Sequence, residues 1–352
     1  MDQGLKMKAI PQAGVSVVIC CYNSATRLRQ TLWHIASQNV SEHIPWEVIL
    51  VDNASIDDTA AFAKRVWIKT GCSTPFEVVD QPIPGLAAAR KKGIAQSRYD
   101  FILFCDDDNW LQKDYVRRAY ETMIRHTEVA ALGGQGEAVS DSPFPKWFER
   151  YAVYYAIGPQ ADQTGDVTNT KGYVYGAGLV LRKSAWEKLR QIGFQSLLTG
   201  RKGDMLTSSE DREICCALRM LGCKVRYDDG LFFKHHITGR RLEWRYFLRL
   251  VQTAHRTTPH IVAYHAVLNG RMPVNSLSWY WLRRCMTILK RALKRPNLIM
   301  AAALNREGSH AAFIWRQMLG EWQGWWAVRK DYVQIFETIR NLQGRLINGT
   351  EP

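Results

Sequence analysis

The segments SVVICCYNS at residues 16–24 and EVILVDNASIDDT at residues 47–59 decide the fold. Each begins with a run of mostly β-branched, apolar residues and ends in polar side chains, and a helical pattern at Ala25–Ser37 separates the two runs. Strands that are apolar throughout, instead of alternating with polar residues, are typical of a parallel sheet that is buried on both faces. The two segments therefore predict a strand–helix–strand unit and an α/β fold.

The alternation of strands and helices continues along the chain. Four strands are predicted at Val15–Cys20, Glu47–Val51, Phe76–Val79 and Phe101–Cys105, and four helices at Ala25–Ser37, Asp57–Trp67, Leu86–Gln96 and Lys113–Arg125. Beyond residue 134 the pattern becomes irregular, and later elements are predicted at Leu179–Leu181, Ser184–Ile192, Ser209–Leu221, Lys224–Tyr227 and Leu231–Lys234. The pattern predicts a doubly wound, mostly parallel sheet, whose ligands bind beyond the carboxyl ends of its strands.

The charge of the chain is unevenly distributed. The 352 residues carry 47 Lys and Arg against 33 Asp and Glu, a net charge of +14, and this length corresponds to about two domains. Residues 234–352 hold 19 of the basic and 6 of the acidic residues, so this part has a net charge of +13 and the remainder is nearly neutral. We therefore expect a catalytic domain at residues 1–240 and a basic helical region at residues 241–352.

Features that the sequence lacks argue against several classes of protein. The eight cysteines lie mostly in apolar runs and form no CxxC pair, which indicates reduced core residues in a cytosolic compartment. The N-terminal residues show no secretory signal, and no apolar run is long enough for a transmembrane helix. There is no GxxxxGK[ST] loop, and the glycines at 133–136 lack the full dinucleotide-binding spacing.

Polar residues follow the predicted strands where they end. Tyr22 follows the first strand, Asp52 the second, and Asp106, Asp107 and Asp108 the fourth. Three adjacent carboxylates repel one another and are costly at a buried edge unless a cation neutralises them. Oxygen ligands suit Mg²⁺ and Mn²⁺, which also bridge phosphates. The cluster therefore indicates a metal–diphosphate site, and the competing structural interpretation is an acidic turn in which Asp108 caps the next helix.

Other residues allow either a catalytic or a structural interpretation. Glu210 and Asp211 open a predicted helix, where they would suit the helix dipole and a capping box, or where a carboxylate would accept the proton of an attacking hydroxyl. His235 and His236 follow an apolar strand and would either ligate a metal or pack at a sheet edge. Arg90 precedes two lysines and would either bind phosphate or belong to a solvated basic face.

Seven segments, taken in order, resemble the family 2 glycosyltransferases, which have the glycosyltransferase A fold. The resemblance spans about residues 15–250 and rests on SVVICCYNS, EVILVDNASIDDT, GLAAARKKGI (85–94), FILFCDDDNW (101–110), GAGLVLRKSAW (176–186), SSEDREICCALRMLG (208–222) and HHITGRRLEWRYF (235–247). The second segment departs from the common family pattern at Ile56, where a Gly-Ser-Thr-Asp loop is usual.

The resemblance implies an inverting transfer of a sugar from a nucleotide-diphosphate sugar to an acceptor hydroxyl, with Mn²⁺ or Mg²⁺ as cofactor. By motif position, the donor would be held by Tyr22 and Asp52 at the nucleobase, Arg90 at the base or diphosphate, Asp106 at the ribose, and Asp107 beside it. Asp108 would bind the metal, with His235 or His236 as a further contact. Asp211 would be the catalytic base, with Glu210 supporting it.

The basic C-terminal part predicts a membrane contact. It contains seven of the 13 tryptophans: Trp244, Trp279, Trp281, Trp315, Trp322, Trp325 and Trp326. Within a predicted helix at Leu277–Lys294, apolar residues recur at helical spacing at Leu282, Met286, Leu289 and Leu293, and a basic stripe recurs at Arg241, Arg245 and Arg249. Such a helix is typical of contact with anionic lipid headgroups. The alternative is that these helices pack on the catalytic domain; no module that binds nucleic acid is present.

These features together predict a metal-dependent glycosyltransferase of cell-surface polysaccharide or lipid-linked glycan assembly, peripheral on the inner face of the cell membrane. Two alternatives stay open at this point. A sugar nucleotidyltransferase would share the sheet and the acidic metal site but would release pyrophosphate instead of a nucleoside diphosphate. A non-catalytic, membrane-associated protein that binds a nucleotide sugar is the other alternative.

Overall fold

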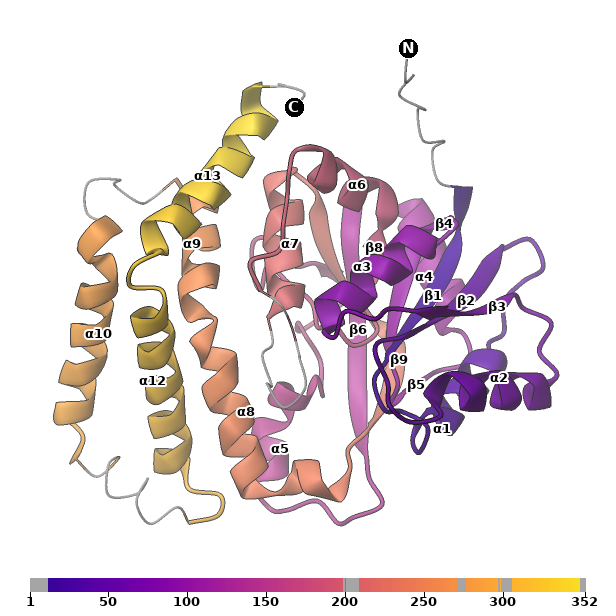
Figure 1. Cartoon of the computed structure of the whole chain (residues 1–352), viewed down its shortest axis with the longest axis horizontal. Helices are drawn as coiled ribbons and strands as arrows, with labels where there is room; N and C mark the ends of the chain where they lie inside the picture. The colour runs from indigo at the N-terminus through magenta and orange to yellow at the C-terminus, as the bar shows by residue number, and fades with distance from the viewer. Residues whose placement is uncertain are drawn as a thin grey trace.

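One mixed sheet organises the molecule (Figure 1). The computed structural model describes residues 12–198, 200, 209–270, 277–296, 298 and 306–348. The strands are β1 (Gln12–Cys21), β2 (Trp46–Asp52), β3 (Phe76–Asp80), β4 (Tyr99–Asp106), β5 (Asn109–Leu111), β6 (Val129–Val139), β7 (Gly165–Asp166), β8 (Val180–Arg182) and β9 (Lys224–His236). Their order is β3-β2-β1-β4-β8-β6-β9-β5, with β7 paired to β9. The first four strands are mutually parallel and β8 is antiparallel to both neighbours, which confirms the predicted mostly parallel α/β sheet.

Helices cover both faces of the sheet because successive side chains of a strand point to opposite faces. In β1, Val17 and Ile19 pack with α1, α2 and α4, whereas Val18 packs with α3, α6 and α7. In α1, Leu28 and Leu32 turn toward the sheet at the four-residue spacing of an amphipathic helix. These helices are α1 (Leu28–Ala36), α2 (Thr59–Thr70), α3 (Leu86–Gln96), α4 (Tyr115–Arg125), α6 (Lys183–Gln191) and α7 (Glu210–Met220).

The second half of the sheet differs from the sequence-based prediction. Where two strands were expected, β9 is one strand that passes through Asp228-Asp229-Gly230, and its register against β6 shifts between Gly133 and Gln135. This bulge absorbs the polar triplet without ending the strand. The irregular segment predicted beyond residue 134 begins only after Val139, because β6 continues through the glycines; between Val139 and β8 the chain forms only elements of two to four residues. A Cβ on Gly134 would collide with the carbonyl oxygen of Leu231, so the close approach of the two strands requires glycine.

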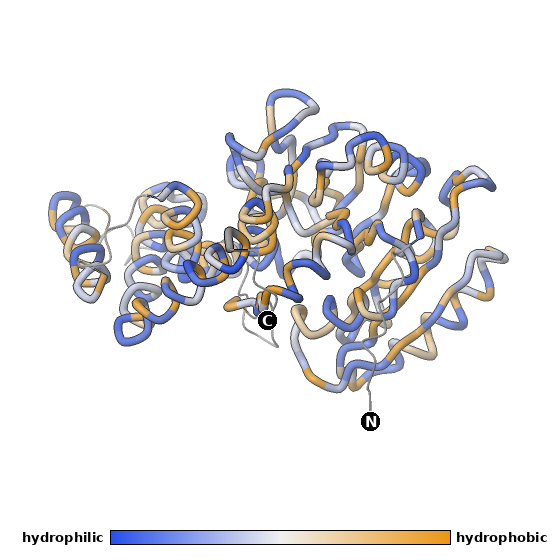
Figure 2. The backbone as a smooth tube through the Cα atoms, turned by 90° about the horizontal axis from the view of Figure 1, so that it is seen from above, coloured by the Kyte–Doolittle hydropathy of each residue, from blue (hydrophilic) through white to orange (hydrophobic). Residues whose placement is uncertain are grey.

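The C-terminal helices stand beside the sheet on the side of α7 (Figures 1 and 2). The remaining helical elements are α5 (Phe148–Tyr151), η1 (Ala152–Tyr155), η2 (Gly239–Leu242), α8 (Trp244–Arg256), α9 (Thr258–Leu268), α10 (Leu277–Leu293), α12 (His310–Ala327) and α13 (Tyr332–Asn348). One buried cluster contains Ile214 of α7, Tyr264 of α9, Trp325 of α12 and Phe336 of α13. The expected boundary at residue 240 falls within η2, and residues on both sides of it share this core.

From the sequence we expect neither disulfide bonds nor membrane-spanning helices. All eight cysteines lie in described parts of the chain and are free thiols, and five of them are buried. Within the described ranges, no helix combines the length and the apolar composition needed to cross a bilayer.

Candidate functional site

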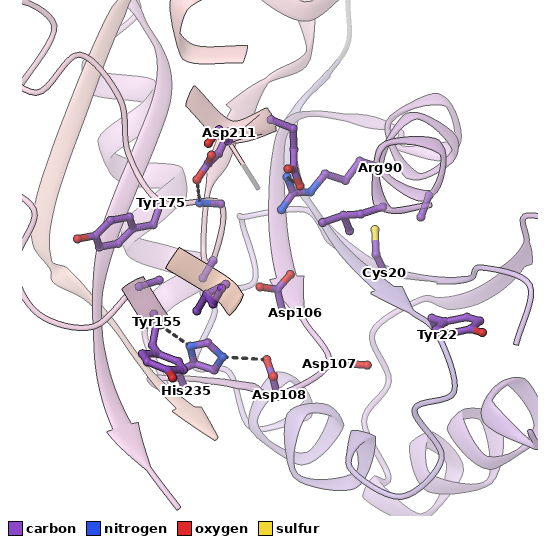
Figure 3. A pocket seen from close by; sticks show the side chains of 18 of the residues that line it. Cys20, Tyr22, Arg90, Asp106, Asp107, Asp108, Tyr155, Tyr175, Asp211 and His235 are labelled. Atoms are coloured by element: carbon purple, nitrogen blue, oxygen red, sulfur yellow. Dashed lines mark hydrogen bonds and ion pairs between the residues drawn. The ribbon is translucent and has the colours of Figure 1, made fainter. Parts of the chain in front are cut away.

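A pocket of about 770 Å³ opens at the carboxyl ends of β1 and β4 (Figure 3). The strand register creates it: Cys20 of β1 lies opposite Asp106 of β4, and Cys21 lies opposite Asp52 of β2. The lining residues lie between Cys20 of β1 and Ala254 of α8. Among them are Tyr22, Arg90, Asp106, Asp107, Asp108, Tyr155, Tyr175, Glu210, Asp211, His235 and Arg241. The sheet therefore brings most of the predicted site residues together.

At the end of the pocket near β1 and β2 lie an exposed tyrosine ring and a carboxylate oxygen without a hydrogen-bond partner. Tyr22 lies on the rim with 45% of its surface exposed. Asp52 does not line the pocket itself, but its Oδ1 is buried at the end of β2 without a hydrogen-bond partner. Asn53, which the sequence did not mark as a site residue, donates through Nδ2 to the carbonyls of Gln81 (3.0 Å) and Ile83 (2.6 Å). These bonds fix the turn that leads into the helix of Arg90.

The three adjacent aspartates have different surroundings. The side chain of Asp106 points into the pocket (Figure 3). Asp107 instead forms an ion pair with Arg27 at 2.6 Å and accepts a hydrogen bond from Ser24, which ties the loop after β1 to the end of β4. Burial and the neighbouring Asp108 raise the pKa of Asp107, and the Arg27 guanidinium opposes them. Asp107 therefore has a structural role that the sequence did not reveal.

Asp108 and His235 face each other across the lower part of the pocket. His235 Nε2 lies 3.4 Å from Asp108 Oδ1, and His235 Nδ1 lies 2.8 Å from the carbonyl oxygen of Tyr155. Because a carbonyl only accepts, Nδ1 carries the proton in the neutral ring and Nε2 keeps its lone pair toward the pocket. The Arg241 Nη1 occupies the same place, 2.7 Å from Asp108 Oδ2 and 3.2 Å from His235 Nε2.

His236 lies on the other side of β9. Its Nε2 is 3.0 Å from Asp141 Oδ2, and its ring stacks on Trp110 with centroids 5.4 Å apart. Adjacent residues of a strand point to opposite faces, so only one of the two histidines reaches the pocket. The structure places His235 there, and His236 has the packing role that was the alternative.

The donor set would suit a divalent cation that accepts both oxygen and nitrogen ligands. Asp108 offers a carboxylate oxygen and His235 an imidazole lone pair oriented by a backbone carbonyl, as metal-bound histidines usually are. Among the residues that the structure describes, no three His, Cys, Asp or Glu side chains gather closely enough to hold a metal ion. Mg²⁺ is usually bound by one or two carboxylates together with substrate phosphates and water. Two protein donors therefore suffice for a metal that arrives with a diphosphate, provided that Arg241 moves.

The two acidic residues at the start of α7, Glu210 and Asp211, have different partners. Glu210 forms a buried ion pair with Arg90, 3.1 Å from Oε1 to Nη1, with side-chain exposures of 8% and 7%. Asp211 accepts a hydrogen bond at Oδ2 from the backbone N–H of Gly176 at 2.9 Å, and it faces the pocket (Figure 3). Ser209 has a φ of +88° and its side chain does not cap the helix, so the alternative of a capping box does not hold at Ser209; Ser208 lies outside the described residues.

Aromatic residues form the wall of the pocket beside Asp211. We call Tyr154, Tyr173 and Tyr175 the tyrosine wall; all three line the pocket. The Arg212 guanidinium lies 4.8 Å from the ring centre of Tyr173. Lys171 lies behind the wall, with Nζ 3.9 Å from the ring centre of Tyr175, and burial lowers its pKa to about 8 against the attraction of Asp211. No sequence signal distinguished these residues from ordinary core aromatics.

Comparisons with known proteins show the family and the fold that this chain resembles. Residues 16–190 match the family described as Glycosyl transferase family 2. The poly-β-1,6-N-acetyl-D-glucosamine synthase of Staphylococcus epidermidis is 22% identical over 218 residues, 61% of this chain and 48% of the synthase. The succinoglycan biosynthesis protein ExoM of Rhizobium meliloti is 30% identical over 135 residues, 38% of this chain and 42% of ExoM. The matches thus span less than half the length of either relative.

A solved structure extends the likeness to almost the whole fold. The crystal structure of S. aureus TarS 1–349 in complex with UDP-GlcNAc aligns with a TM-score of 0.50. The alignment covers 91% of this chain and 92% of the TarS chain at 15% sequence identity. At this identity the likeness establishes a common fold, including the C-terminal helices.

Proposed function

Since the chain belongs to glycosyl transferase family 2, we propose that it transfers a sugar from a nucleotide-diphosphate sugar to an acceptor hydroxyl with inversion. The observation that carries the proposal is the position of Asp211, whose carboxylate is oriented by Gly176 and faces the same pocket as Asp106 and Asp108. The proposed base and the acidic residues proposed to bind the donor thus line the same pocket, so both can act on one bound nucleotide sugar. The complex of TarS with UDP-GlcNAc supports this class of donor.

Asp211 is the general base in this reaction. It removes the proton from the acceptor hydroxyl as the oxygen attacks the anomeric carbon, and the bond from that carbon to the diphosphate breaks with its electron pair leaving on the diphosphate. One displacement from the opposite face inverts the anomeric configuration. Glu210 does not share the proton transfer, because its carboxylate neutralises the buried Arg90.

The donor lies along the carboxyl ends of the strands. Tyr22 on the rim stacks against the nucleobase. Asp52, which is half-buried at the end of β2, accepts a hydrogen bond from the nucleobase through its carboxylate. Asp106 binds the ribose. Mn²⁺ or Mg²⁺, held by Asp108 and His235, would neutralise the charge of the leaving diphosphate. Arg90 fixes the floor of this region, where its guanidinium lies 5.2 Å from the ring centre of Phe104.

The acceptor is a growing polysaccharide or a lipid-linked glycan. The tyrosine wall beside Asp211 offers flat apolar faces and hydroxyls, which suit the two sides of a sugar ring. The assignment of the relatives to poly-β-1,6-N-acetyl-D-glucosamine and succinoglycan synthesis supports a polysaccharide acceptor.

We also propose that the protein works as a peripheral protein at the inner face of the cell membrane. Trp279, Met286, Leu289 and Leu293 lie on one side of α10 and are between 45% and 68% exposed. Basic side chains, including Lys290 and Lys294, flank this stripe and are also exposed. The free thiols support a reducing compartment.

The first test combines product analysis with one substitution. Incubation of the protein with Mn²⁺, a panel of nucleotide sugars and a glycan acceptor is expected to release a nucleoside diphosphate; pyrophosphate would indicate a nucleotidyltransferase. Asp211→Asn should lower kcat at least about a hundredfold because the base is lost, while the Kd of the donor stays unchanged. Asp331→Asn, an exposed carboxylate before α13, is the control. Full activity of Asp211→Asn would refute the assignment of the base.

A further inference from the structure

Arg241 fills the place at which a cation would bind. It follows β9 in η2, and its side chain is 12% exposed. Its Nη1 lies 2.7 Å from Asp108 Oδ2 and 3.2 Å from His235 Nε2, which leaves no room for another cation between the two groups. The backbone carbonyl of Arg241 accepts the hydroxyl of Tyr155 at 2.7 Å, so the loop that carries the guanidinium is anchored. Arg241 is therefore held in the site by both its side chain and its backbone.

The same atoms would serve a divalent metal ion. Asp108 Oδ1 and His235 Nε2 are 3.4 Å apart, and the Tyr155 carbonyl turns the Nε2 lone pair toward Asp108. A guanidinium nitrogen and a divalent cation both need this lone pair and this carboxylate. They also repel each other at such short range, because both groups that hold them are little exposed and solvent screens the charges only weakly. The two cations therefore exclude each other.

We propose that Arg241 is an internal counter-ion that occupies the Asp108–His235 pair when no divalent cation is bound, and that the cation displaces it toward the diphosphate. The proposal rests on the proposed metal-dependent transfer. A displaced guanidinium stays inside the pocket and would form the paired hydrogen bonds that it makes well with phosphate oxygens. Arg241 would then weaken the binding of metal alone and strengthen the binding of metal together with nucleotide.

Mn²⁺ binding to the full chain tests this exchange without any turnover. Free Mn²⁺ is titrated by electron paramagnetic resonance against the wild type, Arg241→Gln and the control Arg240→Gln, whose side chain is the exposed neighbour in η2. We expect Arg241→Gln to bind Mn²⁺ about tenfold more tightly, because one competing charge is removed, and Arg240→Gln to match the wild type. In the presence of saturating Mn²⁺, Arg241→Gln should bind UDP about tenfold more weakly.

Tighter Mn²⁺ binding together with weaker UDP binding distinguishes the proposed exchange of Arg241 and metal from damage to the fold. A disrupted pocket would weaken both ligands, and Arg241→Lys, which keeps the charge on a slimmer side chain, should restore UDP binding in part. If Mn²⁺ binds to Arg241→Gln as it does to the wild type or more weakly, Arg241 does not compete with the metal and the proposal is wrong. If none of the proteins binds Mn²⁺ and sugar transfer persists in EDTA, the metal dependence in the proposed function fails as well.

Discussion

The ion pair between Arg90 and Glu210 shows how burial changes the contribution of an ion pair to stability. Both side chains are more than nine-tenths buried, so removal of the carboxylate would leave a guanidinium without a counter-charge in the core of the site. We expect Glu210→Gln to lower the free energy of unfolding by about 3 kcal/mol, measured by urea denaturation.

The exposed pair between Arg117 and Glu121 on α4 is a matched control. Its N–O distance of 3.0 Å is almost the same as the 3.1 Å of the buried pair, but the Glu121 side chain is 45% exposed. Solvent screens such a pair, and Glu121→Gln should cost less than about 1 kcal/mol. Equal losses for the two substitutions would show that burial does not set the strength of the Arg90 pair.

Most residues of the pocket could be predicted from the sequence, because polar residues follow the ends of the predicted strands. The sequence did not show which ion pairs and hydrogen bonds each of these side chains would form. Asp106 and Asp211 face the pocket as the resemblance implied, and the period of a strand predicts that only one of His235 and His236 can do so. The competition of Arg241 for Asp108 depends on the fold of η2 after β9, a tertiary arrangement that leaves no local pattern. Arg241 was instead expected in an exposed basic stripe, and that expectation is wrong.

Among the elements, the segment that leads into β8 contains two glycines with different roles. Gly178 has a φ of +70°, and a Cβ there would collide with the hydroxyl of Tyr115. Gly176 has no such backbone requirement, but a Cβ there would lie 2.9 Å from Arg90 Nη2 and 3.5 Å from Asp211 Cβ. The two positions therefore need glycine for different reasons: Gly178 for its backbone conformation, and Gly176 for the closeness of Arg90 and Asp211.

Alanine at each position should separate these two roles. We expect Gly178→Ala to lower the free energy of unfolding by about 2 kcal/mol, because alanine is strained at positive φ. Gly176→Ala should cost less stability than Gly178→Ala, because only side-chain atoms must shift, and should lower kcat/KM at least about tenfold, because it displaces Arg90 and the base. Urea denaturation and initial-rate kinetics on both variants provide the measurements. A large loss of stability without a kinetic effect in Gly176→Ala would contradict its role in the site.

The elements that the sequence predicted well are those with a simple period. The βα units up to residue 125 matched their predictions closely, because apolar strands and amphipathic helices repeat in a regular way. β6 and β9 were missed or divided because glycines and the Asp228-Asp229-Gly230 triplet are common signals of turns. In the structure they form a bulge between two paired strands, which only the partner strand could reveal.

At the scale of the whole molecule, the C-terminal helices have an inner and an outer side. The inner side belongs to the core: Trp244 and Trp325 are buried, as are Cys285 and Ile288 of α10. Packing on the catalytic part, the alternative kept at the sequence level, is therefore correct for this side. α10 lies at the edge of the molecule farthest from the sheet (Figure 1). Its outer side keeps the apolar stripe of Trp279, Met286, Leu289 and Leu293 exposed.

A vesicle experiment decides whether this stripe contacts a bilayer. The full chain should sediment with vesicles that contain anionic lipid and much less with neutral ones, because apolar insertion and the basic flanks act together. The double substitution Leu289→Glu and Leu293→Glu should reduce binding at least about tenfold, since two apolar contacts are lost and two repulsive charges are added. Added NaCl should weaken wild-type binding by screening the basic residues.

The matched control places the same double change on another part of the surface. Ile68 on α2 and Ile124 on α4 are 78% and 45% exposed, comparable with the 68% of Leu293 and the 46% of Leu289, but they belong to the nearly neutral part of the chain. The double substitution Ile68→Glu and Ile124→Glu should therefore leave sedimentation unchanged if the stripe of α10 is the contact. Equal loss of binding in the control and the α10 variant would point to the net charge alone. Wild-type protein that stays in the supernatant with anionic vesicles would remove the membrane from the proposal, and the acceptor would then have to reach the tyrosine wall from solution.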